Sequence, residues 1–298
     1  MALQRFAFRA MAAANEIQVD GDDPGRAHAA AGEAIAEVLR IEAKYSRYRP
    51  DSVLSRINVG AGGAPVAVDP ETEALLDYAG ACWHESAGLF DATSGVLRRA
   101  WDFGARRVPG EAELAPLLAL VGWQRVERSP GRVRLPLAGM ELDFGGLGKE
   151  YAVDRAVAVL RDAGVASALV NLAGDLAILG PRPGGQPWRV GLRHPRREGE
   201  LAATFAVTSG AIATSGDYER FVEVDGVRHC HVLDPRTGRS AQGFQSVSVH
   251  APACLVAGSA TTVAMLKGES EGLAWLEALG LPFHAILADG RVTGRDPG

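Results

Sequence analysis

The sequence predicts an α+β fold in which antiparallel strands dominate and helices pack on the sheets. Segments with apolar residues at alternating positions, typical of strands, occur in runs at the start, in the middle and near the end of the chain. Helical segments are spaced unevenly between these runs, whereas a doubly wound sheet would alternate strand and helix regularly. The chain has 298 residues and no clear linker or repeat, so we expect a single domain over residues 1–298.

The first half of the chain predicts a strand, two helices and a polar insertion. Residues 4–20 alternate apolar and polar side chains well enough for a strand. An Ala-, Glu- and Arg-rich segment at about 26–44 has the apolar spacing of an amphipathic helix, and a second helix is expected at about 70–86. Residues 105–130 are expected to form a short helical insertion, and residues 131–143 a hairpin.

The second half is predicted to contain most of the antiparallel strands. A helix is expected from Lys149 onward, and Gly164 stands in the usual position just past a helix end. Further strands are expected at 166–180, 187–195, 207–212, 218–233, 245–250 and 284–287, and further helices at about 255–267 and 272–279.

The stretch Glu141–Asp154, with the sequence ELDFGGLGKEYAVD, is the centre of the prediction. A short strand is expected to end around Asp143, three glycines follow, and a helix begins at Lys149. Free backbone N–H groups beside the positive end of a helix dipole can hold a phosphate. The pattern is neither a dinucleotide fingerprint nor a P-loop, which would need Ser or Thr where Glu150 stands. A tight turn without a ligand stays open as the alternative.

A second polar cluster contains two histidines in the segment RHCHVLDPRTG. A lone histidine near a turn, such as His231, is more often packed or exposed than catalytic. His229 and His231 stand at i and i+2 on an expected strand, but no third nitrogen or sulfur ligand follows at a spacing typical of zinc sites.

Other polar residues have a structural interpretation beside a functional one. Asp91 in GLFDATSG could cap the following segment, and Asp175 in NLAGDLAILG could be a turn residue. Tyr48 and Arg49 could stack on or pair with a ligand, although such a pair at a helix end is usually amphipathic surface.

The composition excludes several classes of protein. A net charge of −5 argues against a nucleic-acid or anionic-membrane surface, and no apolar run is long enough to span a membrane. Cys82, Cys230 and Cys254 are far apart, which excludes a disulfide framework and favours a reducing compartment. Because Arg5 and Arg9 interrupt the first apolar residues, we expect a cytoplasmic protein; a periplasmic location stays open if an export signal was removed.

Taken together, these clusters resemble the ApbE family over nearly the whole chain. One matching segment would be weak, but six in the family's order and spacing are specific. The matching segments are YSRYRPDSVLSRIN, GLFDATSGVL, LDFGGLGKEYAVDRA, VNLAGDLAILG, TSGDYERF and HVLDPRTG. The resemblance implies an α+β single domain, which agrees with the pattern of apolar residues.

The resemblance also implies an activity, that of the FAD:protein FMN transferases. Such enzymes bind FAD with Mg²⁺ and pass the FMN half to a Ser or Thr hydroxyl of a target flavoprotein, releasing AMP. It implies that His231 accepts the proton of that hydroxyl and that Lys149 neutralises the pyrophosphate. Carried over position by position, it places flavin contacts at Met11, Tyr48, Leu89, Phe90, Asp91, Asp143, Lys149 and Val232, and metal contacts at the backbone oxygen of Gly146, at Gly258 and at Thr262.

Two departures from the family pattern bear on the activity. Residues 11–13 read Met-Ala-Ala where Met-Gly-Thr is usual, and Gly258 replaces the metal-binding Asp four residues before Thr262. Glycine supplies no carboxylate, and Mg²⁺ prefers at least one. Glu150, where the family has Gly, is one possible substitute. If Gly258 marks a vacant ligand position, Gly258→Asp is expected to raise the affinity for Mg²⁺.

Other oxygens could also fill the position, namely Ser259 or a water held by Asp175; otherwise metal binding is weak. The sequence therefore leaves three functions open. The chain is a working FMN transferase that acts on a flavin-acceptor protein, an FAD pyrophosphate hydrolase that uses water as acceptor, or an FAD-binding protein that has lost the metal.

Overall fold

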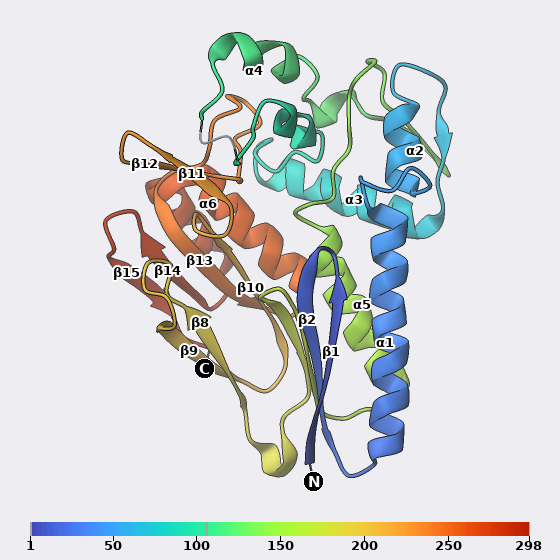
Figure 1. Ribbon diagram of the computed structural model, residues 1–298, viewed down its shortest axis with the longest axis vertical. Coiled ribbons are helices and arrows are strands. Elements are labelled where there is room, and N and C mark those ends of the chain that lie inside the picture. Colours follow the sequence, from blue (N-terminus) through green and yellow to red (C-terminus); the bar gives the residue numbers. More distant parts are fainter. Residues whose placement is uncertain (1, 105–106, 298) are drawn as a thin grey trace.

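The computed structural model describes residues 2–104 and 107–297, and within them one antiparallel sheet of eight strands forms the framework (Figure 1). The order of its strands is β1-β2-β6-β7-β10-β13-β14-β15, so that both ends of the chain contribute edges. The strands are β1 (Ala2–Ala10), β2 (Ala13–Gly21), β6 (Ala168–Leu172), β7 (Asp175–Leu179), β10 (Gly210–Gly216), β13 (Phe244–Ala251), β14 (Phe283–Leu287) and β15 (Val292–Arg295). The predicted α+β fold class is confirmed.

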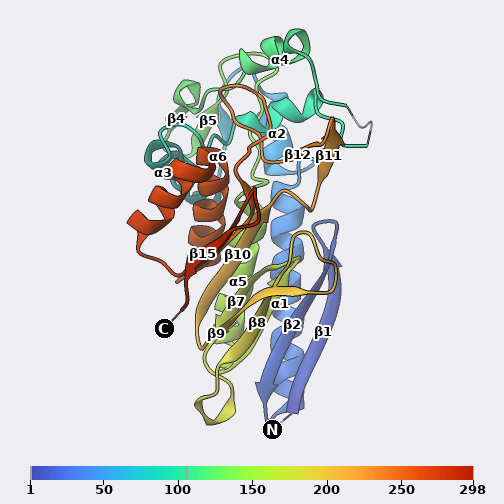
Figure 2. The ribbon, with the colours of Figure 1, turned by 90° about the vertical axis from the view of Figure 1, so that its left-hand side faces the viewer.

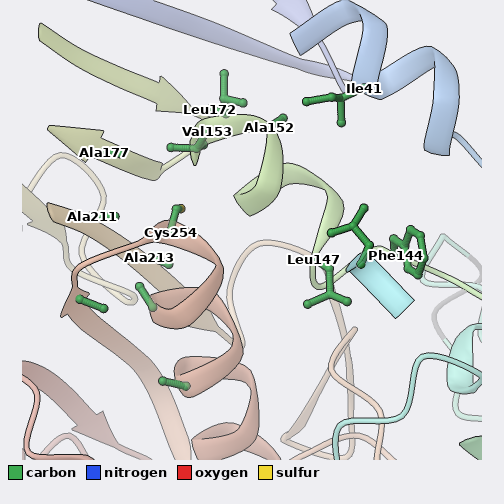
Figure 3. Close-up of a cluster of buried hydrophobic side chains, with 14 of the residues drawn as sticks. Ile41, Phe144, Leu147, Ala152, Val153, Leu172, Ala177, Ala211, Ala213 and Cys254 are labelled. Carbon is green, nitrogen blue, oxygen red and sulfur yellow. The ribbon is translucent and has the colours of Figure 1, made fainter. Parts of the chain in front are cut away.

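Three helices cover one face of this sheet: α1 (Pro24–Tyr45), α5 (Gly148–Asp162) and α6 (Cys254–Leu279). The main core lies between these helices and the sheet. Figure 3 shows Ile41 of α1, Val153 of α5 and Cys254 of α6 in the same cluster of buried side chains as Leu172 and Ala177 of the sheet. Burial of this apolar surface is the main favourable term that holds the helices in place.

A hairpin of β8 (Trp188–Arg193) and β9 (Leu201–Val207) covers the opposite face (Figure 2). A second core lies between this hairpin and the sheet, with Leu169 and Ile178 on one side and Trp188 on the other. Because successive side chains of a strand point to opposite faces, the central strands bury both faces and consist mainly of apolar residues.

The remaining elements lie mostly beyond the end of the sheet where the β1–β2 turn lies (Figure 1). They are α2 (Val53–Val59), α3 (Pro70–Glu85) and α4 (Glu111–Leu118), the short strands β3 (Val66–Ala67), β4 (Glu127–Ser129), β5 (Arg132–Arg134), β11 (Phe221–Val224) and β12 (Val227–Cys230), and 3₁₀ turns at Ser94–Arg99, Trp123–Arg125 and Pro183–Gly185. Within the described residues, no helix is both long and apolar enough to cross a membrane.

Most of the predicted helices are confirmed, with boundaries that differ by a few residues. The two helices expected at 255–267 and 272–279 are both present within α6, where the backbone leaves the helical conformation at Gly268 (φ 72°, ψ −176°) between them. The prediction of a single strand over residues 4–20 is wrong, because these residues belong to the hairpin β1–β2. Its two turn residues, Met11 and Ala12, have positive φ (53° and 60°), as a two-residue hairpin turn requires, although neither is Gly or Asn.

The prediction of a strand that ends around Asp143 is also wrong. The backbone of this stretch forms hydrogen bonds with a side chain and a loop carbonyl instead of with a neighbouring strand. Asn58 accepts the N–H of Leu142 at 2.7 Å and donates to its carbonyl at 2.9 Å, and the N–H of Asp143 donates to the carbonyl of Ala92 at 2.8 Å. The hairpin expected at 131–143 lies earlier, in the pairing of β4 with β5. The sequence analysis missed the helix α2 and the strand β15.

Helix α5 is tied to the start of α6 by a carboxylate. Asp154 accepts the backbone N–H groups of Cys254 at 2.7 Å and Leu255 at 3.0 Å, while Ala253, at the N-cap position of α6, has no side chain to do so. A negative charge at a helix N-terminus satisfies unpaired donors and interacts favourably with the helix dipole. Asp154 therefore caps a helix that is distant in sequence.

We expect Asp154→Ala to lower the free energy of unfolding by about 1–3 kcal/mol, because it leaves two N–H groups of α6 without their charged acceptor. Urea unfolding measures this loss. The matched control is Asp162→Ala at the exposed end of the same helix, where a change within about 0.5 kcal/mol is expected. Equal effects of the two substitutions would contradict the capping role.

Candidate functional site

A cleft of about 790 Å³ opens where the N-terminus of α5 meets the sheet and the loops beyond it. Its wall includes residues of the 89–95 loop, the glycine turn before α5, the strands β7 and β10, and the segment that follows β12. This volume lies within the range of cofactor and substrate sites.

Lys149, Glu150 and Asp175 form the floor of the cleft, which therefore carries one ammonium group and two acidic side chains. Lys149, in the first turn of α5, forms an ion pair with Asp175 at the start of β7. Burial by itself lowers the pKa of Lys149, but the charges of Asp175 and then Glu150 outweigh it and raise that pKa. Asp175 also accepts the N–H of Thr214 at 3.3 Å. Lys149 is therefore a fixed positive charge on the floor.

Glu150 is the second carboxylate of the floor, and it is buried. Burial, and then the neighbouring Asp175, raise the pKa of Glu150 above its ordinary value. Its Oε2 atom has no hydrogen-bond partner among the described residues. The side chain lies against Gly258 of α6, where an added Cβ would stand 2.5 Å from the Cγ of Glu150.

Two hydroxyl groups line the same cleft as these carboxylates. Ser215 and Thr262 line the cleft, and their hydroxyl oxygens are 3.4 Å apart. Hard oxygen donors of this kind are the ligands that Mg²⁺ prefers. Within residues 2–104 and 107–297, no three His, Cys, Asp or Glu side chains form a metal-binding group. A cation here would therefore need hydroxyl, carbonyl or substrate oxygens as well.

The glycine turn offers fewer free N–H groups than its sequence suggests. The N–H of Gly145 donates to Asp143 at 2.9 Å, and the N–H of Gly148 donates to the carbonyl of Phe144 at 2.6 Å. In the part of the chain that the structure describes, no side chain caps the N-terminus of α5. The attraction for an anion therefore comes from the helix end and Lys149 rather than from a cradle of several backbone donors.

His231 follows β12 directly and lines the cleft, where it is exposed to water. Its backbone N–H donates to the carbonyl of Arg220 at 3.0 Å, which fixes the segment. The protein atoms around the cleft desolvate the imidazole and lower the pKa of His231, with smaller effects from the charges of Arg220, Glu219 and Lys149. A neutral imidazole at pH 7 can accept a proton. His229 instead lies beside Trp101, with ring centres 6.0 Å apart.

The comparison with known families agrees with this arrangement. A model of the ApbE family matches residues 11–286. The chain belongs to the ApbE family.

Relatives of this ApbE-family chain include an FAD:protein FMN transferase of Treponema pallidum, 34% identical over 285 residues that cover 89% of this chain and 79% of the relative. Another is the FAD:protein FMN transferase of Salmonella typhimurium, 32% identical over 258 residues, which cover 82% of this chain and 73% of the relative.

Solved ApbE structures have the same fold. The ApbE protein of Thermotoga maritima superposes with a TM-score of 0.91 at 30% identity, covering 99% of this chain and 97% of that one. The apo flavinyl transferase ApbE of Pseudomonas stutzeri gives a TM-score of 0.86 at 28% identity, with 99% and 95% covered.

The fold brings together most of the site residues that the ApbE resemblance implies. Residues Met11, Leu89, Phe90, Asp91, Asp143, Gly146, Lys149, His231, Val232 and Thr262 all line the cleft. Tyr48 and Gly258 do not line it: Tyr48 is 77% exposed, and Gly258 packs behind Glu150. The roles assigned to all these residues stay predictions.

Among the arginines near Tyr48, the cleft residue is Arg47 rather than Arg49. Arg47 forms an ion pair with Asp143, and its guanidinium lies 4.9 Å from the centre of the Tyr48 ring. Arg49 pairs with Asp51 at the surface at 2.8 Å. Arg47 was not among the predicted site residues, although it stands inside the motif YSRYRP.

Other lining residues that were missed, Asn171, Ser215 and Tyr218, also belong to the family motifs quoted above. Asp91 has the structural role that its sequence allowed. It accepts the N–H and the hydroxyl of Thr93 at 2.7 and 2.6 Å, and the N–H of Trp123 at 2.9 Å. These bonds hold the loop that carries Phe90.

Proposed function

We propose that this chain is an FAD:protein FMN transferase, which moves the FMN half of FAD to a Ser or Thr hydroxyl of a flavin-acceptor protein and releases AMP. Family membership and the names of the relatives support the activity. The observation that carries the proposal is that a cation at a helix N-terminus, Lys149, and a proton acceptor, His231, line the same cleft.

The residues of the cleft account for both halves of this transfer. The acceptor hydroxyl attacks the phosphorus of the FMN half, its proton moves to the imidazole of His231, and the bond from that phosphorus to the oxygen of AMP breaks. Lys149 and the positive end of α5 stabilise the negative charge that develops on the phosphate oxygens.

The donor set of the cleft fits Mg²⁺, because an unpartnered buried carboxylate oxygen and two neighbouring hydroxyls line the same cleft. The Gly146 carbonyl, the Thr262 hydroxyl and a floor carboxylate would hold the ion together with the FAD diphosphate. Bound there, Mg²⁺ would neutralise part of the diphosphate charge.

The direct test is incubation of the protein with FAD and Mg²⁺, with and without a candidate flavin-acceptor domain. AMP release and covalent in-gel fluorescence of the acceptor are followed together. We expect AMP only with the acceptor, and an equal amount of labelled acceptor. AMP at the same rate without an acceptor would indicate a hydrolase, and tight FAD binding without AMP would indicate a flavin-binding protein.

We expect the protein to bind FAD at least about ten times more tightly than riboflavin, a difference of about 1.4 kcal/mol that the diphosphate contacts would supply. Lys149→Met should narrow this ratio, because one charge-assisted contact is lost. Calorimetric titration with both ligands gives the ratio. Lys149→Arg, which keeps the charge, is the control. Equal affinities of the wild type for the two ligands would contradict the prediction.

His231→Ala should slow transfer by about 10²–10⁴-fold and leave FAD binding nearly unchanged. Since the pKa of His231 lies below the ordinary value of 6.5, the wild-type rate should fall with decreasing pH only once the imidazole gains its proton below that value. Rates measured from pH 5 to pH 8 test this, and the variant should lose this acid limb. His229→Ala is the control and should keep it. Loss of FAD binding in His231→Ala without slower turnover would show that the histidine is structural.

A further inference from the structure

We infer that Glu150 of α5 supplies the carboxylate that binds the divalent cation in this chain, and that Gly258 of α6 is the space this side chain occupies. The inference rests on the proposed function, because the cation is expected to bind together with the FAD diphosphate. It assigns the ligand to a helix other than the one on which the family pattern places it.

The Glu150 side chain is buried and has an oxygen without a hydrogen-bond partner. It is only 6% exposed, it lines the cleft, and its Oε2 atom has no hydrogen-bond partner among the described residues. A buried carboxylate oxygen without a partner is costly, and such oxygens normally have a donor, a water or a metal ion. The described residues supply no donor for this atom, so a cation could be its partner.

Lys149 already has an acidic partner on the cleft floor. Lys149 is paired with Asp175, whose carboxylate is 5% exposed, and it is the only ammonium group among the described residues that lines this cleft. Glu150 lies beside this pair and makes no ion pair of its own with the described residues. A divalent cation shared with a diphosphate would give its carboxylate a partner.

The position of Glu150 relative to α6 also supports the inference. Gly258 and Thr262 are one turn apart on α6 and share a face of that helix. Because the Glu150 side chain fills the space beside Gly258, its carboxylate lies on the same helix face as the Thr262 hydroxyl. The Ser215 hydroxyl is 3.4 Å from that of Thr262. One carboxylate and two hydroxyls thus converge on the cleft floor.

The contact also shows that a side chain at position 258 would compete for space with the side chain of Glu150. A Cβ at position 258 would stand 2.5 Å from the Cγ and 3.0 Å from the Oε1 of Glu150. The structure therefore argues against the expectation that Gly258→Asp alone raises Mg²⁺ affinity. A carboxylate can come from α5 or from α6, but a second one has no room.

The test is a titration with Mn²⁺, followed by its electron paramagnetic resonance, on protein saturated with FAD and without an acceptor. Glu150→Gln should weaken Mn²⁺ binding by about tenfold or more, since one anionic ligand is lost. The double variant Glu150→Gly/Gly258→Asp moves the carboxylate to α6 and should restore the affinity to within about threefold of the wild type. Gly258→Asp alone should bind Mn²⁺ no better than the wild type and should melt at a lower temperature.

The control is Glu33→Gln, an exposed glutamate of α1, which should match the wild type. FAD affinity is measured separately in EDTA by quenching of flavin fluorescence. If the wild type binds FAD and Mn²⁺ and Glu150→Gln binds Mn²⁺ equally well, or if the double variant stays as weak as Glu150→Gln, the assignment of Glu150 is overturned while the proposed function stands. If the wild type does not bind FAD, the proposed function fails and the inference fails with it.

Discussion

The docking of α5 against α6 is the contact on which the site depends. Asp154 and Glu150 stand one turn apart on α5; the first caps the start of α6, and the second lies against Gly258 one turn further along that helix. Residues four apart share a helix face, so these two contacts fix both the spacing and the rotation of the helices. With α5 held in this orientation, Lys149 reaches Asp175 on β7. A helix rotated by a fraction of a turn would separate the charges of the floor.

The charges on the floor of the cleft are arranged to bind a ligand and do not stabilise the protein by themselves. Two acidic side chains, Glu150 and Asp175, lie near one ammonium group in a partly buried site, and one oxygen of Glu150 lacks a donor among the described residues. Such an arrangement lowers stability, because the low dielectric strengthens repulsion as well as attraction. The open N-terminus of α5 adds a positive potential beside it. Together these features are complementary to an anion that brings a cation with it, which is the chemistry of a metal-bound diphosphate.

The features that could be predicted from the sequence are those that depend on residues close together in the chain. The helices α1 and α5 and the strands β6 and β7 followed from local periodicity, and the clustering of most of the candidate residues in one cleft agreed with the motif resemblance. The backbone around Asp143 could not be predicted, because Asn58, its partner, belongs to a distant segment. The hairpin turn at Met11 and Ala12 lacks the Gly or Asn that usually marks positive φ.

Gly258 and Glu150, both of which differ from the family pattern, lie in contact with each other. In isolation, a glycine at 258 indicates a lost ligand, and a glutamate at 150 indicates a carboxylate in a crowded glycine turn. The structure links the two positions, because the side chain at 150 occupies the space that a side chain at 258 would need. The departure at residues 11–13 is different. There Ala12 accepts a left-handed conformation that costs an L-residue about 1–2 kcal/mol. The turn is held from outside, by Glu42 accepting the N–H of Met11 at 2.6 Å. One departure thus keeps an acidic side chain in the cleft, and the other is tolerated because a neighbouring helix holds the turn.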